Sequence, residues 1–255
     1  MTNHPRSICF DLLANVIFAT TLFAQQSPPP TLTTAGAHAP FYVSAASATE
    51  RDGSLRWSAF DSPTQFIIQR RIAASQTTRA ASQSVASATE PCQATVHLYH
   101  VSGRVDSLDA MIATAPAVYR GQIISITPGF EMGSPSILIG VQITHAVRTA
   151  TNFPSKGIVY VLYPKADFAI AGTRFCNGGL MGSYSPSTGD RMLIFSFDPP
   201  RDTTSSFLLT RPQQLVFEHG GTVFASKPLD LSNRPELESL QALENTIPTM
   251  KPEQP

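Results

Sequence analysis

The stretch ILIGVQITHAVR, residues 137–148, decides the fold class of this chain. Its apolar residues keep a spacing of two: Ile137, Ile139, Val141, Ile143 and Val147. The positions between them include Gly140, Gln142, Thr144 and Arg148. A period of two places the two sets on opposite faces of an extended strand. One apolar face and one polar face are typical of a half-buried antiparallel strand, so the sequence predicts a β sheet built around this segment.

A short helix and a second strand are predicted on the N-terminal side. Asp106 or Ser107 can cap a helix that runs to about Ala115 and places its apolar residues on one face. Pro116 ends this helix because proline cannot continue it. The segment AVYRGQIISI, residues 117–126, is then predicted to be a strand with a bulge or bend at Gly121. A turn containing Pro128, Gly129 and Gly133 is expected after it.

Further short apolar blocks predict more strands. TVHLYHV (95–101), IVYVLYP (158–164) and RMLIFSF (191–197) have strand length and composition, and a long loop separates the last two. QLVFEHGGTVFA is predicted to be a hairpin that turns at Gly220-Gly221. The segment from Pro235 to Ile247 is predicted to be an amphipathic helix.

These elements amount to five or six strands with two helices and no alternation of strand and helix. This pattern favours a mainly β fold, a small antiparallel barrel or sandwich, over a doubly wound sheet.

The N-terminus has the pattern of a secretory signal peptide. Arg6 precedes an apolar run from Leu12 to Ala24, which is shorter than the ~20 residues of a membrane span. We therefore expect residues 1–24 to be removed and the protein to be secreted or periplasmic. The alternative is a frayed N-terminal helix of a cytosolic protein.

Residues 25–91 are rich in Ala, Ser, Thr, Gln and Pro and are predicted to be a disordered linker. An island at residues 55–72 interrupts the linker and holds the only tryptophan. Phe66-Ile67-Ile68 in this island is predicted to be a weakly ordered strand. The folded domain is expected over residues 92–247, with a tail at 248–255.

The cysteines indicate the redox compartment of the protein, and the charges limit the classes of partner that it can bind. Removal of residues 1–24 removes Cys9 and leaves Cys92 and Cys176, which are expected to form a disulfide in an oxidising compartment. The alternative is that both are buried thiols. Lys plus Arg and Asp plus Glu number 18 each, so there is no excess charge to attract nucleic acid or an anionic membrane.

Part of the chain resembles the netrin-like module, the group that includes the tissue inhibitors of metalloproteinases. The resemblance runs from Cys92 to Phe197. It rests on SLDAMIATAPAVYRG (107–121), the long alternating strand, the cysteine-containing loop and Gly189-Asp190. It implies a five-stranded OB-like antiparallel barrel with one or two flanking helices, and it places Cys92 and Cys176 at the positions of paired cysteines.

The chain departs from that family at three positions. Pro116 replaces the acidic residue of the family's strand start, and Ala94 stands where a Cys-x-Cys start would have its second cysteine. In the inhibitors, a cysteine at the mature N-terminus presents its amine and carbonyl to the catalytic zinc. Cys92 follows a long segment, so this mechanism would require cleavage at Pro91.

No residue pattern predicts catalysis, a cofactor or a metal site. His97 and His100 lie three apart and point to opposite faces of a strand, and His145 is expected to be a core or rim residue. Glu218-His219 lacks the second histidine of a helical zinc site. The segment 182–186 fails the G-x-S-x-G pattern at its last position.

The sequence therefore predicts a secreted or periplasmic, non-enzymatic binding module. Its candidate binding surface comprises Tyr119, Phe175 and Tyr184, near the loop that contains Cys176. The expected partner is a protein, for example a protease, or a cell-envelope component, and the oligomeric state stays open. Two alternatives remain: an envelope hydrolase or metal-dependent enzyme that uses His97, His100 or His145, and a structural surface protein with a spacer.

Overall fold

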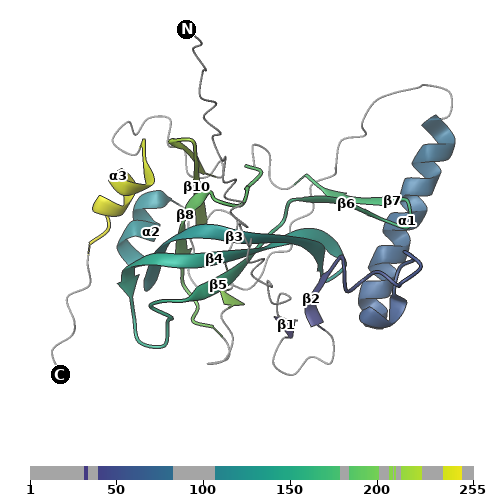
Figure 1. The fold of residues 1–255 in the computed structure, drawn as a ribbon, viewed down its shortest axis with the longest axis horizontal. Coiled ribbons are helices and arrows are strands. Elements are labelled where there is room, and N and C mark those ends of the chain that lie inside the picture. The colour runs from purple at the N-terminus through teal and green to yellow at the C-terminus, as the bar shows by residue number, and fades with distance from the viewer. Residues whose placement is uncertain are drawn as a thin grey trace, which may run out of the picture.

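The computed structural model describes residues 32–33, 40–82, 107–178, 184–200, 207–208, 210, 214–225 and 238–248 (Figure 1). The predicted signal peptide, the predicted strand 95–101, Cys92 and the end of the tail lie outside these residues. Among the helices of the described residues, none is long and apolar enough to cross a membrane.

A nine-stranded sheet forms the centre of the protein. Its main path has the order β11-β10-β8-β3-β4-β5-β9, with β2 paired to β3 and β1 paired to β2. The strands are β1 (Leu32–Thr33), β2 (Pro40–Ser44), β3 (Ala117–Glu131), β4 (Ser134–Thr149), β5 (Ile158–Tyr163), β8 (Arg191–Ser196), β9 (Phe207–Leu208), β10 (Leu215–His219) and β11 (Thr222–Ala225). All pairs are antiparallel except β5 with β9. A separate hairpin joins β6 (Ala166–Ile170) to β7 (Thr173–Asn177).

The mainly β prediction is confirmed, but the five-stranded barrel is not, because the sheet does not close. The long hairpin of β3 and β4 explains the difference. The first part of β3, Ala117–Gln122, pairs with β8. The last part of β3, from Gly129 to Glu131, pairs with residues 42–44 of β2. The added strands therefore extend the sheet instead of closing it.

The β3-β4 hairpin matches the predicted strands but turns later than expected. The ladder is irregular between Arg120 and Gly121, as the glycine predicted. Pro128 and Gly129 lie inside β3, so the turn predicted there is wrong at these two residues. The chain instead turns at Met132 and Gly133, whose φ angles are 47° and 80°.

Two helices cover one face of the sheet. In α2 (Leu108–Thr114), Ser107 Oγ caps the helix by accepting a hydrogen bond from Ala110 N at 3.2 Å. In α3 (Leu240–Asn245), Ser239 Oγ does the same for Ala242 N at 3.1 Å. Both helices therefore begin at a serine cap, as local sequence rules require. Apolar residues of both helices share one core: Leu108, Met111, Ile112, Leu240, Leu243 and Ile247.

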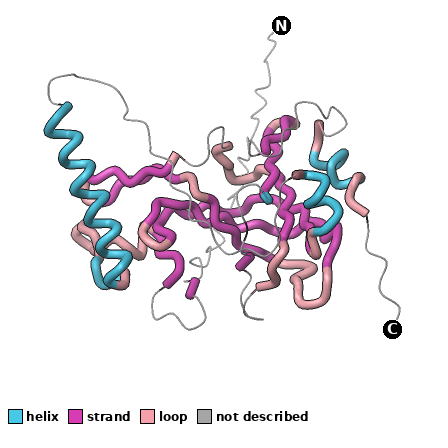
Figure 2. The backbone as a smooth tube through the Cα atoms, turned by 180° about the vertical axis from the view of Figure 1, so that it is seen from behind, coloured by secondary structure: helices cyan, strands magenta, loops and turns pink. Residues whose placement is uncertain are grey.

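Helix α1 (Ser62–Ser82) replaces the strand predicted at Phe66–Ile68, and that prediction is wrong. Asp61 Oδ1 accepts a hydrogen bond from Thr64 N at 3.0 Å, and Pro63 lies in the first turn. The Asp61 cap and Pro63 both stabilise the start of a helix. These two signals are stronger than the preference of the three apolar residues for a strand. The short helix η1 (Trp57–Ala59) precedes α1. Seen from behind, α1 lies at the opposite end of the sheet from α2 and α3 (Figure 2).

A second core lies under α1. Ile68 of α1, Val43 of β2 and Phe130 of β3 are buried there, together with Ile170 and Phe175 of the β6-β7 hairpin. The sequence predicts a linker at β2 and at the end of α1, an island of residues 55–72 at the start of α1, and a loop at β6 and β7. All four elements belong to this end of the fold.

Candidate functional site

Two of the residues predicted to bind a partner are buried. Tyr119 has no exposed surface and packs with Ile139 and Val141 in the main core. Phe175 is buried and meets Phe130 edge to face, with ring centroids 5.0 Å apart. Neither side chain can present a binding face, which corrects that prediction. Successive side chains of a strand point to opposite faces of the sheet. Tyr119 and Phe175 lie on faces that are covered by the core.

Tyr184 is half-buried and belongs to a polar cluster with Asp190 and His219. The Tyr184 hydroxyl donates to Asp190 Oδ2 at 2.8 Å, and Ser187 N donates to the same oxygen at 2.7 Å. His219 Nδ1 lies 2.6 Å from Asp190 Oδ1. The Tyr184 ring stacks on Phe224, with centroids 4.3 Å apart. The cluster therefore fastens the loop before β8 onto the β10-β11 hairpin.

The Asp190 carboxylate is stabilised in its ionised form. Burial alone would raise the pKa of Asp190, but the hydrogen bonds from His219, Ser187 N and Tyr184 outweigh it and lower the pKa. A carboxylate on Nδ1 leaves the other imidazole nitrogen, Nε2, as the free position of the ring. The His219 side chain is exposed, with 61% of its surface accessible. No group of three or more His, Cys, Asp or Glu side chains that could hold a metal ion occurs in the described part of the chain.

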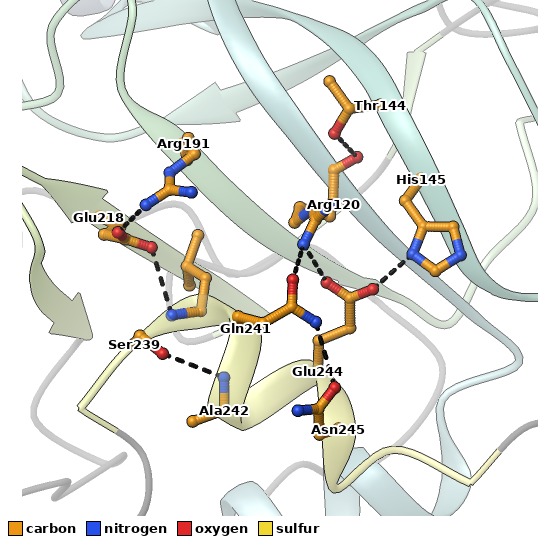
Figure 3. A network of polar contacts seen from close by, with 11 residues as sticks. Arg120, Thr144, His145, Arg191, Glu218, Ser239, Gln241, Ala242, Glu244 and Asn245 are labelled. Atoms are coloured by element: carbon orange, nitrogen blue, oxygen red, sulfur yellow. Dashed lines mark hydrogen bonds and ion pairs between the residues drawn. The ribbon is translucent and has the colours of Figure 1, made fainter.

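A second polar network holds α3 against the sheet (Figure 3). The buried Glu244 carboxylate accepts a hydrogen bond from Arg120 Nη1 at 2.8 Å and pairs with His145 Nδ1. Arg120 also donates to Gln241 Oε1. His145 is therefore a partner of a carboxylate on the rim of the sheet.

Glu218 of β10 fastens the start of the same helix. Its carboxylate pairs with Arg191 of β8, and its Oε2 accepts a hydrogen bond from Leu240 N at 3.2 Å (Figure 3). Each of the carboxylates Glu218 and Glu244 therefore has an arginine partner and at least one further partner. Such a satisfied network positions a helix and leaves little capacity to bind a ligand.

Three large exposed apolar side chains come from elements at the α1 end of the molecule. In the described residues, the large apolar side chains that stay exposed are Trp57 (36%), Phe66 (59%), Met132 (49%) and Ile158 (36%). The first three come from η1, α1 and the β3-β4 turn, and we call them the distal tip.

Contacts between these elements bring the distal tip together. Gln65 Nε2 of α1 donates to Trp57 O at 3.0 Å. The β3-β4 turn lies on α1, because a Cβ added at Gly133 would come within 3.0 Å of Ile67 Cγ2. The sequence offered one hint of this surface, the apolar island in a polar linker. It did not show that a turn some 70 residues away joins it.

Glu131 lies directly before the turn and is buried, with 2% of its surface exposed. Ser136 Oγ donates to its Oε2 at 3.0 Å, and its Oε1 has no hydrogen-bond partner. Burial raises the pKa of Glu131 to about 7, although the hydrogen bond from Ser136 lowers it.

The substitution Glu131→Gln is expected to stabilise the protein at alkaline pH by ~3 kcal/mol. Below pH 4.5, the ordinary value, the carboxyl group is protonated in both states and has no effect on stability. Between pH 4.5 and about 7 the unfolded chain releases its proton first, so stability falls as pH rises and levels off above that range. Urea unfolding of both proteins near pH 4 and pH 8 measures the effect. An equal difference at both pH values would contradict it.

Cys176 is disulfide-bonded. Its expected partner, Cys92, lies outside the described residues, so the pairing of these two cysteines stays a prediction. The predicted histidines His97 and His100 also lie outside them.

The chain matches no protein-family model and no curated protein sequence.

Proposed function

We propose that this protein is an exported, non-catalytic module that binds another protein through the distal tip. The observation that carries this proposal is Met132, an exposed apolar residue at a φ of 47°. Residues other than glycine, asparagine and aspartate rarely adopt this left-handed conformation, which costs about 1 kcal/mol or more. Strained residues of this kind cluster at functional sites, where binding compensates for the lost stability. An exposed, strained methionine at a turn therefore supports a binding surface.

The composition of the distal tip supports a protein partner. Tryptophan, phenylalanine and methionine are enriched at the centres of protein interfaces. Arg70 lies with its guanidinium carbon 5.8 Å from the centroid of Phe66, which adds a cation to the edge of the patch. The partner surface is therefore expected to be apolar, with an acceptor for Arg70 at its rim.

Export and the netrin-like relationship belong to the same proposal. The signal-peptide pattern and the disulfide at Cys176 support an oxidising compartment. The order of α2, the β3-β4 hairpin, β5, Cys176 and β8 along the chain supports a relationship over residues 92–197. In this relationship, the sheet of this protein would correspond to the family's barrel with its strands not closed into a ring.

Photocrosslinking tests the binding surface. A photoreactive residue placed at Met132 is expected to crosslink a protein of the cell envelope or the medium, and the same residue at Ile158, outside the tip, is not. The crosslinked protein is then purified and its affinity for the wild-type chain is measured. Equal crosslinking from both positions would remove the proposal.

The substitution Met132→Asn is expected to raise stability by ~1 kcal/mol, because asparagine tolerates the left-handed conformation. The same change should weaken partner binding at least tenfold, the loss of one interface anchor. Urea unfolding and titration with the purified partner measure the two effects. Ile158→Asn serves as the exposed control and should not change binding. A stabilised variant with unchanged affinity would show that Met132 is no anchor.

The cluster of Asp190 and His219 favours a second candidate function, an envelope hydrolase. A carboxylate that orients an exposed imidazole is the arrangement of a general base. His219 Nε2 would take a proton from water as the water attacks an ester carbonyl, and would return it to the leaving alcohol. Hydrolysis of ester substrates that is lost in His219→Gln and kept in His145→Gln would favour this function. Equal rates in the wild type and His219→Gln would exclude it for this cluster.

A further inference from the structure

We propose that Glu131 is a proton-operated control of the distal tip, which is held in place when this buried carboxyl group is protonated and loosened when it is ionised. This inference rests on the proposed binding function of the tip and names its regulation.

The position of Glu131 connects it to each part of this end of the fold. It pairs in register with Tyr42 of β2 on one side and with Ser134 of β4 on the other. Met132 of the tip is the next residue in the chain. Arg71 Nη2 of α1 donates to Ser134 Oγ at 3.1 Å, which fastens the helix to the same turn. A change at Glu131 therefore acts directly on the contact between the turn and α1.

The surroundings of Glu131 do not compensate a negative charge. Its Oε2 accepts one hydrogen bond, from Ser136, and its Oε1 accepts none. On the described parts of the neighbouring elements, Tyr42 pairs with Glu131 in the β2 ladder, and Arg71 of α1 reaches the turn through Ser134. Further ionisable groups on these elements have partners elsewhere: Arg70 lies against Phe66, Arg174 pairs with Asp167, His145 pairs with Glu244, and Arg148 donates to Pro248 O. The Tyr42 hydroxyl donates to Thr127 O at 2.5 Å, and burial raises its pKa strongly, so Tyr42 stays neutral. From β7, the uncharged Asn177 donates to Pro135 O at 3.1 Å.

Among the described residues, no ion pair joins Arg71 to this carboxylate: Arg71 Nη2 donates to Ser134 Oγ at 3.1 Å, and Glu131 Oε1 has no hydrogen-bond partner. An ionised carboxylate in this position gains little from its neighbours and would gain more from water. Water reaches it at the lowest cost if the turn and α1 separate, because local opening of an end costs less than opening the central sheet.

Trp57 is the only tryptophan of the chain and lies in η1, directly before Phe60, whose ring packs on Phe130 next to Glu131. Opening of this end should therefore change the exposure of Trp57. The test measures acrylamide quenching of Trp57 fluorescence in the full chain between pH 5 and 9. In the wild type, quenching should increase with a midpoint at about 7. In Glu131→Gln the increase should be lost. In Ser136→Ala the midpoint should move to higher pH, because the hydrogen bond that favours the ionised form is gone.

Two controls keep the result specific. Far-UV circular dichroism should stay constant over this range, which separates local opening from unfolding of the sheet. A chain with both His145→Gln and His219→Gln should keep the wild-type curve, which excludes the two histidines in the described residues as the source of the transition. A flat wild-type curve, or a transition that survives in Glu131→Gln, would overturn the control by Glu131. Crosslinking from Met132 at pH 6 tests the binding surface independently, so the two proposals can fail separately.

Discussion

Replacing Phe130 with alanine is expected to lower the free energy of unfolding by ~4 kcal/mol. Phe130 is buried at the centre of the core under α1 and contacts three other aromatic rings edge to face. Its centroid lies 5.4 Å from Phe60, 5.2 Å from Phe168 and 5.0 Å from Phe175. Alanine would remove the buried area and the three ring contacts, and would leave a cavity between β3 and the β6-β7 hairpin.

Urea unfolding monitored by circular dichroism measures this loss. Phe66→Ala is the matched control, because Phe66 is exposed on α1, and exposed substitutions change stability by about 0.5 kcal/mol or less. Phe130→Leu should lose less than the alanine variant because it keeps most of the buried volume. Similar losses for Phe130→Ala and Phe66→Ala would mean that this end of the protein has no packed core.

Local sequence signals predicted the elements that local physics controls. The alternation in residues 137–148 identified β4, and the serine cap and Pro116 identified α2. At α1 the same kind of signal is present in Asp61 and Pro63, but the strand composition of Phe66–Ile68 predicts the wrong element there. The length of the segment distinguishes a helix from a strand here, since α1 has 21 residues and the apolar run has only three.

Contacts between distant residues could not be predicted from the sequence. His145 and Glu244 are 99 residues apart, and His219 and Asp190 are 29 apart, yet each pair meets through the sheet. The closure of a barrel has the same origin, because it depends on which strand edges meet. Because β3 is long, both β8 and β2 can pair with it, one at each end. The spacing of apolar residues in the sequence does not predict this pairing.

Replacing Arg148 with methionine is expected to cost ~4 kcal/mol, because it would leave two carbonyl groups without their donors. Sequence alternation placed Arg148 on the polar face of its strand, but the side chain is buried. Its Nη1 donates to Ala115 O at 3.0 Å, and its Nε and Nη2 donate to Pro248 O at 3.1 and 2.8 Å. Ala115 is the C-cap of α2, and Pro248 follows α3 closely. One guanidinium therefore joins the ends of both helices.

Methionine keeps the volume of the arginine stem, so the loss in Arg148→Met measures the donors and the charge. Arg148→Lys should lose an intermediate amount, since one ammonium group cannot reproduce a planar fork between two carbonyls. Arg51→Met, at an exposed arginine, is the matched control and should be close to neutral. Equal stability of Arg148→Met and Arg51→Met would contradict the role of Arg148.

A double-variant cycle with Leu243→Ala tests whether Arg148 acts by docking α3. Leu243 is buried on α3 in the core that the helix shares with α2. If loss of Arg148 releases the helix, Leu243 is already partly exposed in Arg148→Met, and its removal then costs less than in the wild type. The two losses should therefore sum to more than the loss in the double variant, by about 1 kcal/mol or more. Strict additivity would mean that Arg148 satisfies the carbonyl of Pro248 without holding α3 in place.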